Sequence, residues 1–180
     1  WAISAAKAAV RGDVSFRITD GPAPHGRKTV IEGGADLQAM RIGGALIWEN
    51  LALRGPGPDG ARALLRIADA VIEGSPCARS VEAQADARID ASGASCCALE
   101  DDVEHGWGQN GSPLILDGLA YVRLASDAPW RKRLAWLRRA QRFSPQPYAT
   151  LARAYAGAGR SEDARRISLA QHDAATLHRS

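Results

Sequence analysis

The chain has 180 residues, of which 46% are hydrophobic and 24% charged, a composition normal for a globular protein. Its apolar residues are mostly Ala, with only two Phe and one Met, which argues against a thick core between two layers and favours a narrow core of small side chains. No apolar run approaches the roughly 18 residues of a membrane-spanning helix, so we expect neither a transmembrane segment nor a signal peptide within these residues.

Short β-type runs dominate residues 1–127. Val14, Phe16 and Ile18 alternate with polar residues, as in a half-buried strand. From Ala35 to Arg54 the apolar residues instead recur every fifth position. When the stretch is divided into consecutive groups of five from Ala35, the central position of the groups holds Leu37, Ile42, Ile47 and Ala52. The position two before it holds Ala35, Met40 and Ala45 in the first three groups.

A period of five matches neither a helix nor a plain strand. It is typical of a square coil whose sides take five residues each, and Ile89, Ala94 and Leu99 keep the same step further on. We therefore predict that residues 1–127 form an irregular right-handed parallel β-helix, a solenoid of the pentapeptide type. The alternative is an ordinary β-sandwich.

Residues 128–180 have a different character. They hold 11 Lys and Arg against 3 Asp and Glu, whereas residues 1–127 hold 12 against 17, so we place a boundary near Asp127. Asp127 with Pro129, Ser144 with Pro145, and Ser161 each predict a helix start. We therefore predict that residues 128–180 form a basic C-terminal cap of about three helices.

The second and third predicted helices have the spacing of a tetratricopeptide hairpin. The residues that carry this spacing are Tyr148, Leu151, Ala152, Tyr155, Gly159 and Ala164. We therefore expect two antiparallel helices that pack through small residues at their crossing.

A longer signature extends from Asp117 to Ala170. It contains Leu116-Asp117-Gly118-Leu119-Ala120-Tyr121 and Arg133-Leu134-Ala135-Trp136-Leu137. It continues through Phe143-Ser144-Pro145-Gln146-Pro147-Tyr148 and Leu151-Ala152 to Ala164-Arg165-Arg166. This signature resembles a family of bacterial pentapeptide-repeat-like proteins that are often labelled membrane-associated or oxidoreductase-like. The resemblance implies a right-handed β-helix followed by helices, and longer family members continue into hydrophobic segments.

Asp101, Asp102, Glu104 and His105 form the densest polar cluster. They could be a cation site or an acid–base pair, but they lack the spacing of a calcium-binding loop, and a solvated turn is the alternative. Cys96 and Cys97 could join His105 in a thiol or zinc site, yet neighbours on a strand point to opposite faces, so small core residues are the alternative. We assign no catalytic residue and no metal ligand.

The glycine pairs Gly33-Gly34 and Gly43-Gly44 do not form a dinucleotide fingerprint, because no G-x-G-x-x-G sequence opens a long helix. We therefore predict no cofactor. Three cysteines with an adjacent pair are a poor disulfide framework, which indicates a reducing compartment. The predicted location is the cytoplasm or the cytoplasmic face of a membrane.

Five cations in the cap are candidate contacts for an anionic surface. They are Arg131, Lys132, Arg138, Arg139 and Arg142. Such residues can meet the phosphates of lipid or nucleic acid, or an acidic protein surface. A solvated helical face is the alternative.

Together these features predict a non-catalytic interaction scaffold, the cytoplasmic part of a bacterial membrane-associated protein. A protein is the expected partner, and an anionic membrane surface is a further one. One alternative is the membrane-associated oxidoreductase that the resemblance implies. Another is nucleic-acid binding through the basic helices, which the acidic residues 1–127 would oppose.

Overall fold

The computed structural model of this chain describes residues 3–16, 28–56, 64–83, 87–108 and 112–177. Within them lie fourteen strands and three helices. In chain order the strands are β1 (Ile3–Ser4), β2 (Ala9–Val10), β3 (Val14–Phe16), β4 (Thr29–Glu32), β5 (Ala35–Asp36), β6 (Arg41–Ile42), β7 (Leu46–Arg54), β8 (Leu64–Arg66), β9 (Val71–Ile72), β10 (Pro76–Ala83), β11 (Arg88–Asp90), β12 (Ser95–Asp101), β13 (Leu114–Ile115) and β14 (Ala120–Leu124). The predicted strand residue Ile18 lies outside the described residues.

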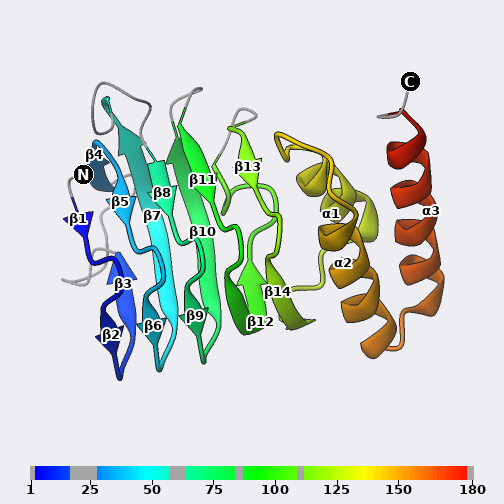
Figure 1. The fold of residues 1–180 in the computed structure, drawn as a ribbon, viewed down its shortest axis with the longest axis horizontal. Helices are drawn as coiled ribbons and strands as arrows, with labels where there is room; N and C mark the ends of the chain where they lie inside the picture. The colour runs from blue at the N-terminus through cyan, green and yellow to red at the C-terminus, as the bar shows by residue number, and fades with distance from the viewer. Residues whose placement is uncertain (1–2, 17–27, 57–63, 84–86, 109–111, 178–180) are drawn as a thin grey trace.

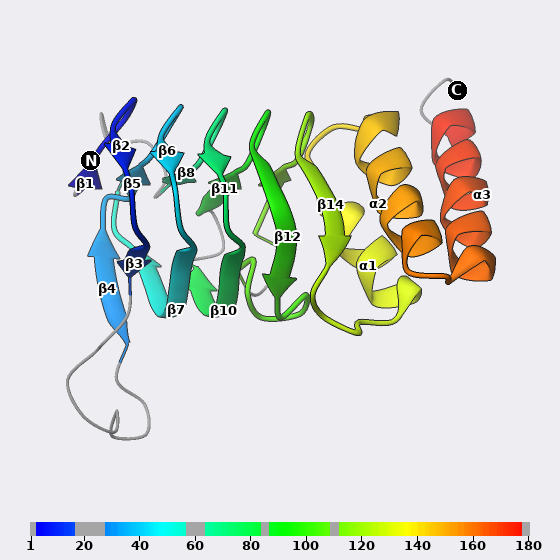
Figure 2. The same ribbon diagram turned by 90° about the horizontal axis from the view of Figure 1, so that it is seen from below.

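Every pairing between these strands is parallel. One sheet has five strands in the order β1-β5-β8-β11-β13. The other has nine, with β2-β6-β9-β12-β10-β7-β3 as its path, β14 paired to β12 and β4 paired to β7. Figures 1 and 2 show the strands following one another along the long axis, with the helices together at the end opposite the N-terminus.

The predicted fold class is wrong. The described residues form an α/β-type arrangement of two parallel sheets, of five and nine strands, with three helices, and they show no closed solenoid. The predicted alternative fails as well, because β-sandwiches are built from antiparallel sheets. The strands here range from two residues in β9 to nine in β7, so a uniform five-residue side does not exist.

The five-residue step also assigned the wrong inward residue in β7. It placed Ile47 inside, but Ile47 is only half-buried, whereas its neighbours Leu46 and Trp48 are fully buried. In a strand the side chains alternate, so burying Leu46 buries Trp48. Asn50, with φ of 50°, then interrupts this alternation, after which Leu51 and Leu53 are both buried.

Tight turns stack beside the five-stranded sheet. Ala39, Asp69 and Gly93 have left-handed φ values of 55°, 57° and 65°. The amide of Ala39 donates to the carbonyl of Ala68 at 2.7 Å, and that of Asp69 donates to Ser92 at 2.7 Å. Each turn is thereby held by the next one along the axis.

The helices are α1 (Trp130–Leu137), α2 (Pro145–Gly157) and α3 (Ser161–Leu177). Asp127 does not cap α1, because the residue at the cap is Pro129, which has extended backbone and no side-chain capping bond. Beyond α2, Gly159 has a φ of 75°, so it suits the left-handed turn toward α3. No helix among the described residues is long and apolar enough to cross a bilayer.

A single buried cluster joins the sheets to the helices. Three tryptophans run through it: Trp48 and Trp107 meet edge-on with ring centroids 5.9 Å apart, and Trp107 and Trp136 lie 5.4 Å apart. Trp48 belongs to β7 and Trp136 to α1. The core therefore is not made only of small residues.

Close approach of neighbouring turns predicts that Gly74→Ala is destabilising. An added Cβ would lie 2.6 Å from the carbonyl oxygen of Gly44, so the backbone must shift. We expect a loss of about 1–3 kcal/mol in the free energy of unfolding, measured by urea denaturation. The matched control is Gly157→Ala in α2, where the Cβ meets nothing within 4 Å. Equal stability of the two variants would contradict this account.

Candidate binding site

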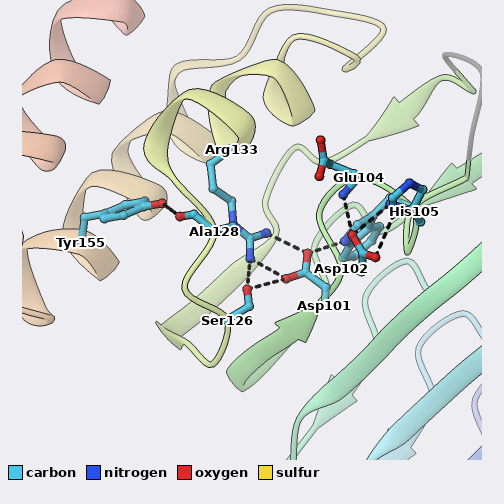
Figure 3. Close-up of polar contacts among 9 residues, drawn as sticks. Asp101, Asp102, Glu104, His105, Ser126, Ala128, Arg133 and Tyr155 are labelled. Atoms are coloured by element: carbon cyan, nitrogen blue, oxygen red, sulfur yellow. Dashed lines mark hydrogen bonds and ion pairs between the residues drawn. The ribbon is translucent and has the colours of Figure 1, made fainter.

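The predicted polar cluster divides between the core and the surface. Asp101 ends β12 and points at Arg133 of α1, and both side chains have 0% exposure. Nη2 of Arg133 donates to Oδ1 of Asp101 at 2.5 Å, and Nη1 donates to Oδ2 at 2.7 Å, a bidentate pair (Figure 3). This contact ties the first helix to the sheet.

Further donors complete the surroundings of Asp101. Trp107 Nε1 donates to Oδ2 at 2.6 Å, and the Ser126 hydroxyl donates to Oδ1 at 3.3 Å. Arg133 also donates to Ser126 at 2.6 Å. Burial alone would lower the pKa of Arg133, but the hydrogen bonds and the charge of Asp101 outweigh it and raise that pKa. Arg133 therefore stays charged, and the role of Asp101 is structural: it holds α1 against the end of β12.

The exposed members of the cluster form a turn (Figure 3). Asp102 accepts hydrogen bonds from the backbone amides of Glu104 and His105, at 3.0 and 3.2 Å, and contacts Nδ1 of His105 at 2.9 Å. Burial raises the pKa of Asp102, but these bonds prevail and hold it below its ordinary value. Glu104 pairs with Lys132 at 2.5 Å. Each carboxylate thus has its own structural contact, and the described residues hold no His/Cys/Asp/Glu group that could bind a metal.

The two adjacent cysteines differ in environment. Cys96 is buried beside the cluster, and burial, followed by the nearby Cys97 and Asp101, raises the pKa of its thiol to about 12. Cys97 is exposed on the opposite face of β12. They therefore do not converge on a shared site.

The five predicted cations do not form one surface. Arg139 is half-buried and donates to the carbonyls of Trp107 and Ser112, at 2.5 and 3.0 Å, and burial lowers its pKa. Lys132 is paired with Glu104, and the guanidinium of Arg131 lies 4.7 Å from the ring centre of Trp130. Arg138 and Arg142 are exposed and make no ion pair with a described residue.

Arg138 and Arg142 instead border a hollow of about 800 Å³. Its walls come from Ser92, from β13 and the turn after it, from most of residues 137–148, and from the last turn of α3. We call this cavity the helix–strand hollow. Its apolar lining includes Ile115, Phe143 and Leu177.

The helix–strand hollow forms where two segments separate. Leu114 of β13 makes an isolated parallel bridge to Ala140, with the Leu114 amide donating to Arg139 at 3.2 Å and the Gln141 amide donating to Leu114 at 3.1 Å. Past that bridge, both segments line the hollow.

Side chains at the start of α2 connect two walls of the helix–strand hollow. The Ser144 hydroxyl donates to Asp117 at 2.6 Å. Gln146 accepts from the Gly118 amide and donates to the Leu119 carbonyl, each at 3.0 Å. These contacts join the start of α2 to the turn after β13, so they fix the positions of these two walls relative to each other.

Sequence reasoning missed the helix–strand hollow as a site. It flagged Arg138 and Arg142 as part of a basic surface and the segment from Phe143 to Tyr148 as part of a family signature, but not together with Leu177. The only signal was that these basic residues immediately precede a Pro- and aromatic-rich segment.

The buried ion pair predicts that Asp101→Asn is strongly destabilising, by about 3–5 kcal/mol, because the Arg133 charge would remain buried without its counter-ion. Urea unfolding followed by circular dichroism measures this. The matched control is Asp102→Asn, whose exposed contacts contribute only about 0.5 kcal/mol, present at neutral pH and lost as the pH falls through the lowered folded pKa of Asp102. A loss below 1 kcal/mol for Asp101→Asn, on the order of the control, would contradict a buried pair.

The cysteine environments predict selective alkylation. Iodoacetamide at mildly alkaline pH should label Cys97 in the folded protein and leave Cys96 unmodified, because the Cys96 thiol is buried and its pKa is raised. Peptide mapping by mass spectrometry identifies the labelled residue. After denaturation both should react. Labelling of Cys96 as fast as Cys97 before denaturation would refute this environment.

In comparisons with known proteins, no family model, no curated protein and no solved structure matches this chain.

Proposed function

We propose that this chain is a non-catalytic interaction scaffold and that its partner docks in the helix–strand hollow. One observation carries the proposal: the hollow has the volume of a ligand site and is bordered by two exposed arginines that have no ion-pair partner among the described residues. Large concave sites with a few converging polar groups are the ordinary places of binding.

The contacts of the other cations support a compact partner over an extended polyanion. Arg139 and Lys132 are engaged in contacts within the chain, and Arg131 stacks on Trp130. A nucleic acid or a lipid surface would need several free cations spread over one face. Here the free positive charge at the candidate site is concentrated on Arg138 and Arg142.

The contacts of the acidic cluster support binding over acid–base chemistry. A general acid or base has to reach a substrate, but Asp101 has 0% side-chain exposure and is saturated by Arg133 and Trp107. Asp102 is used to close its own turn. These carboxylates therefore act in folding.

The location that belongs to this proposal is the cytoplasm or the cytoplasmic face of a membrane. Among the described residues the structure has no disulfide bond. Reduced thiols are typical of reducing compartments. This supports the location without identifying a membrane partner.

Filling the helix–strand hollow should abolish binding. Ala174 lines the hollow from α3, so Ala174→Trp would occupy it, whereas His172→Trp places the same bulk on an exposed position of that helix outside the lining. The probe is anilinonaphthalene sulfonate, an apolar anion whose emission rises on binding. We expect binding at least about tenfold weaker in Ala174→Trp and unchanged in His172→Trp. Unchanged binding in Ala174→Trp, with its circular dichroism intact, would refute the hollow as the docking site.

A further inference from the structure

We infer that the end of the two sheets formed by β1, β2 and β3 binds a second copy of this chain, so that two copies meet end to end. We call this surface the N-terminal end face. It lies opposite the helices, and therefore away from the helix–strand hollow (Figures 1 and 2). The inference goes beyond the proposed function and does not depend on it.

The apolar core is incomplete at the N-terminal end face. β2 and β3 pair in parallel register with β6 and β7, so their residues have counterparts one strand further in. Phe16 is only half-buried, whereas its register partner Trp48 is 0% exposed. Val14 is likewise half-buried, and its partner Leu46 is 0% exposed. The other half-buried apolar residues packed on the core here are Ile3, Ala5, Ala8 and Val10. One further layer of strands would bury all of them.

The same strands present free backbone edges. β1 is the end of the five-stranded sheet, β2 and β3 are the two ends of the path through the nine-stranded sheet, and no described residue pairs with their outer sides. The amides of Ile3 and Ala5 donate inward, so the backbone groups of Ser4 between them face outward. The amide of Val14 also donates inward, so that of Ser15 faces outward.

The strands of the N-terminal end face carry none of the usual protection against pairing. Exposed edges are ordinarily blunted by charged residues or prolines. β1, β2 and β3 read Ile-Ser, Ala-Val and Val-Ser-Phe, without a charge or a proline. The charged residues of 3–16, Lys7, Arg11 and Asp13, lie between the strands, and the Asp13 carboxylate accepts a hydrogen bond from the Ala45 amide at 2.7 Å. The face is therefore suited to strand pairing.

The number of edges selects a second copy over an isolated peptide. One extended peptide could pair with a single edge, and it would leave the other two edges and the incomplete core uncovered. A second copy brings three edges with the same spacing and an equally incomplete core. Two copies related by a two-fold axis can match edge to edge in antiparallel pairing, and each then buries the half-buried apolar residues of the other.

The opposite end of the molecule limits the assembly to two copies. There α2 packs on β14, and the bridge between Leu114 and Ala140 lies beside β13. Since helices cover that end, strand-on-strand stacking cannot continue from it into a filament. A contact between two N-terminal end faces is closed by its own two-fold symmetry.

Sedimentation velocity over a range of concentrations tests the inference on the full chain. We expect a monomer–dimer equilibrium with no larger species. Small-angle scattering should give the dimer about twice the maximum dimension of the monomer, because the strands follow one another along the long axis. A chain that stays monomeric up to its solubility limit, a dimer barely longer than the monomer, or open-ended growth would overturn the inference.

A lysine at the N-terminal end face should block the contact. Val14→Lys should weaken dimerisation at least about tenfold, because the charge would be buried between two copies. In a single copy this half-buried position lets the lysine reach water. The matched control is Val122→Lys, the same change at a 75% exposed position of β14, which should leave the dimer intact. Equal effects of the two variants, with unchanged circular dichroism, would refute the assigned surface.

Hydrogen–deuterium exchange locates the contact without any substitution. Uptake by peptides from residues 3–16 should fall as the protein concentration rises through the dissociation constant, while peptides from β11 should not change. Dimerisation without that protection would overturn the inference. Ala174→Trp should leave dimerisation unchanged, since Ala174 lines the hollow and not this face, so failure of the docking site and failure of the dimer are distinguishable.

Discussion

The ion pair between Asp101 and Arg133 is the contact on which the C-terminal half of the molecule depends. It joins the end of β12 to α1 with both charges removed from water, and Ser126 and Trp107 add further hydrogen bonds to the pair. Removing one partner of a buried pair is strongly destabilising, because the other charge is left buried without a counter-ion. Compared with apolar packing, however, the intact pair contributes little net stability. Its role is to select one orientation of α1 against the strands.

The orientation of α1 determines the path of the chain beyond that helix. Trp136 of α1 packs on Trp107, and Arg139, just past the helix, donates to the carbonyls of Trp107 and Ser112. These contacts set the chain beside β13, where Leu114 and Ala140 form their bridge. The helix–strand hollow is the space left where the segments then diverge. The proposed docking site is therefore a consequence of how the core is closed.

The cations of the cap show why a basic sequence does not define a binding surface. Arg131, Lys132, Arg138, Arg139 and Arg142 are close in sequence, yet they stack on an aromatic ring, pair with a carboxylate, bind backbone carbonyls or border the hollow. Sequence alone could identify the positive charge and its position in and just after the first helix. It could not identify the acceptors, because Glu104, Trp107 and Ser112 lie some thirty residues away and meet these cations only after folding.

The sequence by itself determined the division of the chain into a strand-rich part and a basic helical part, because side-chain periodicity, prolines and charge are local properties. Only the tertiary structure decided the fold class: strand pairing put Leu46 and Trp48 inside in place of Ile47, and the parallel strands assembled into sheets of five and nine. The burial of Asp101 with Arg133 and the walls of the hollow were decided at the same level. Each depends on residues distant in sequence, and the free energy of desolvation that fixes them exists only when those residues meet.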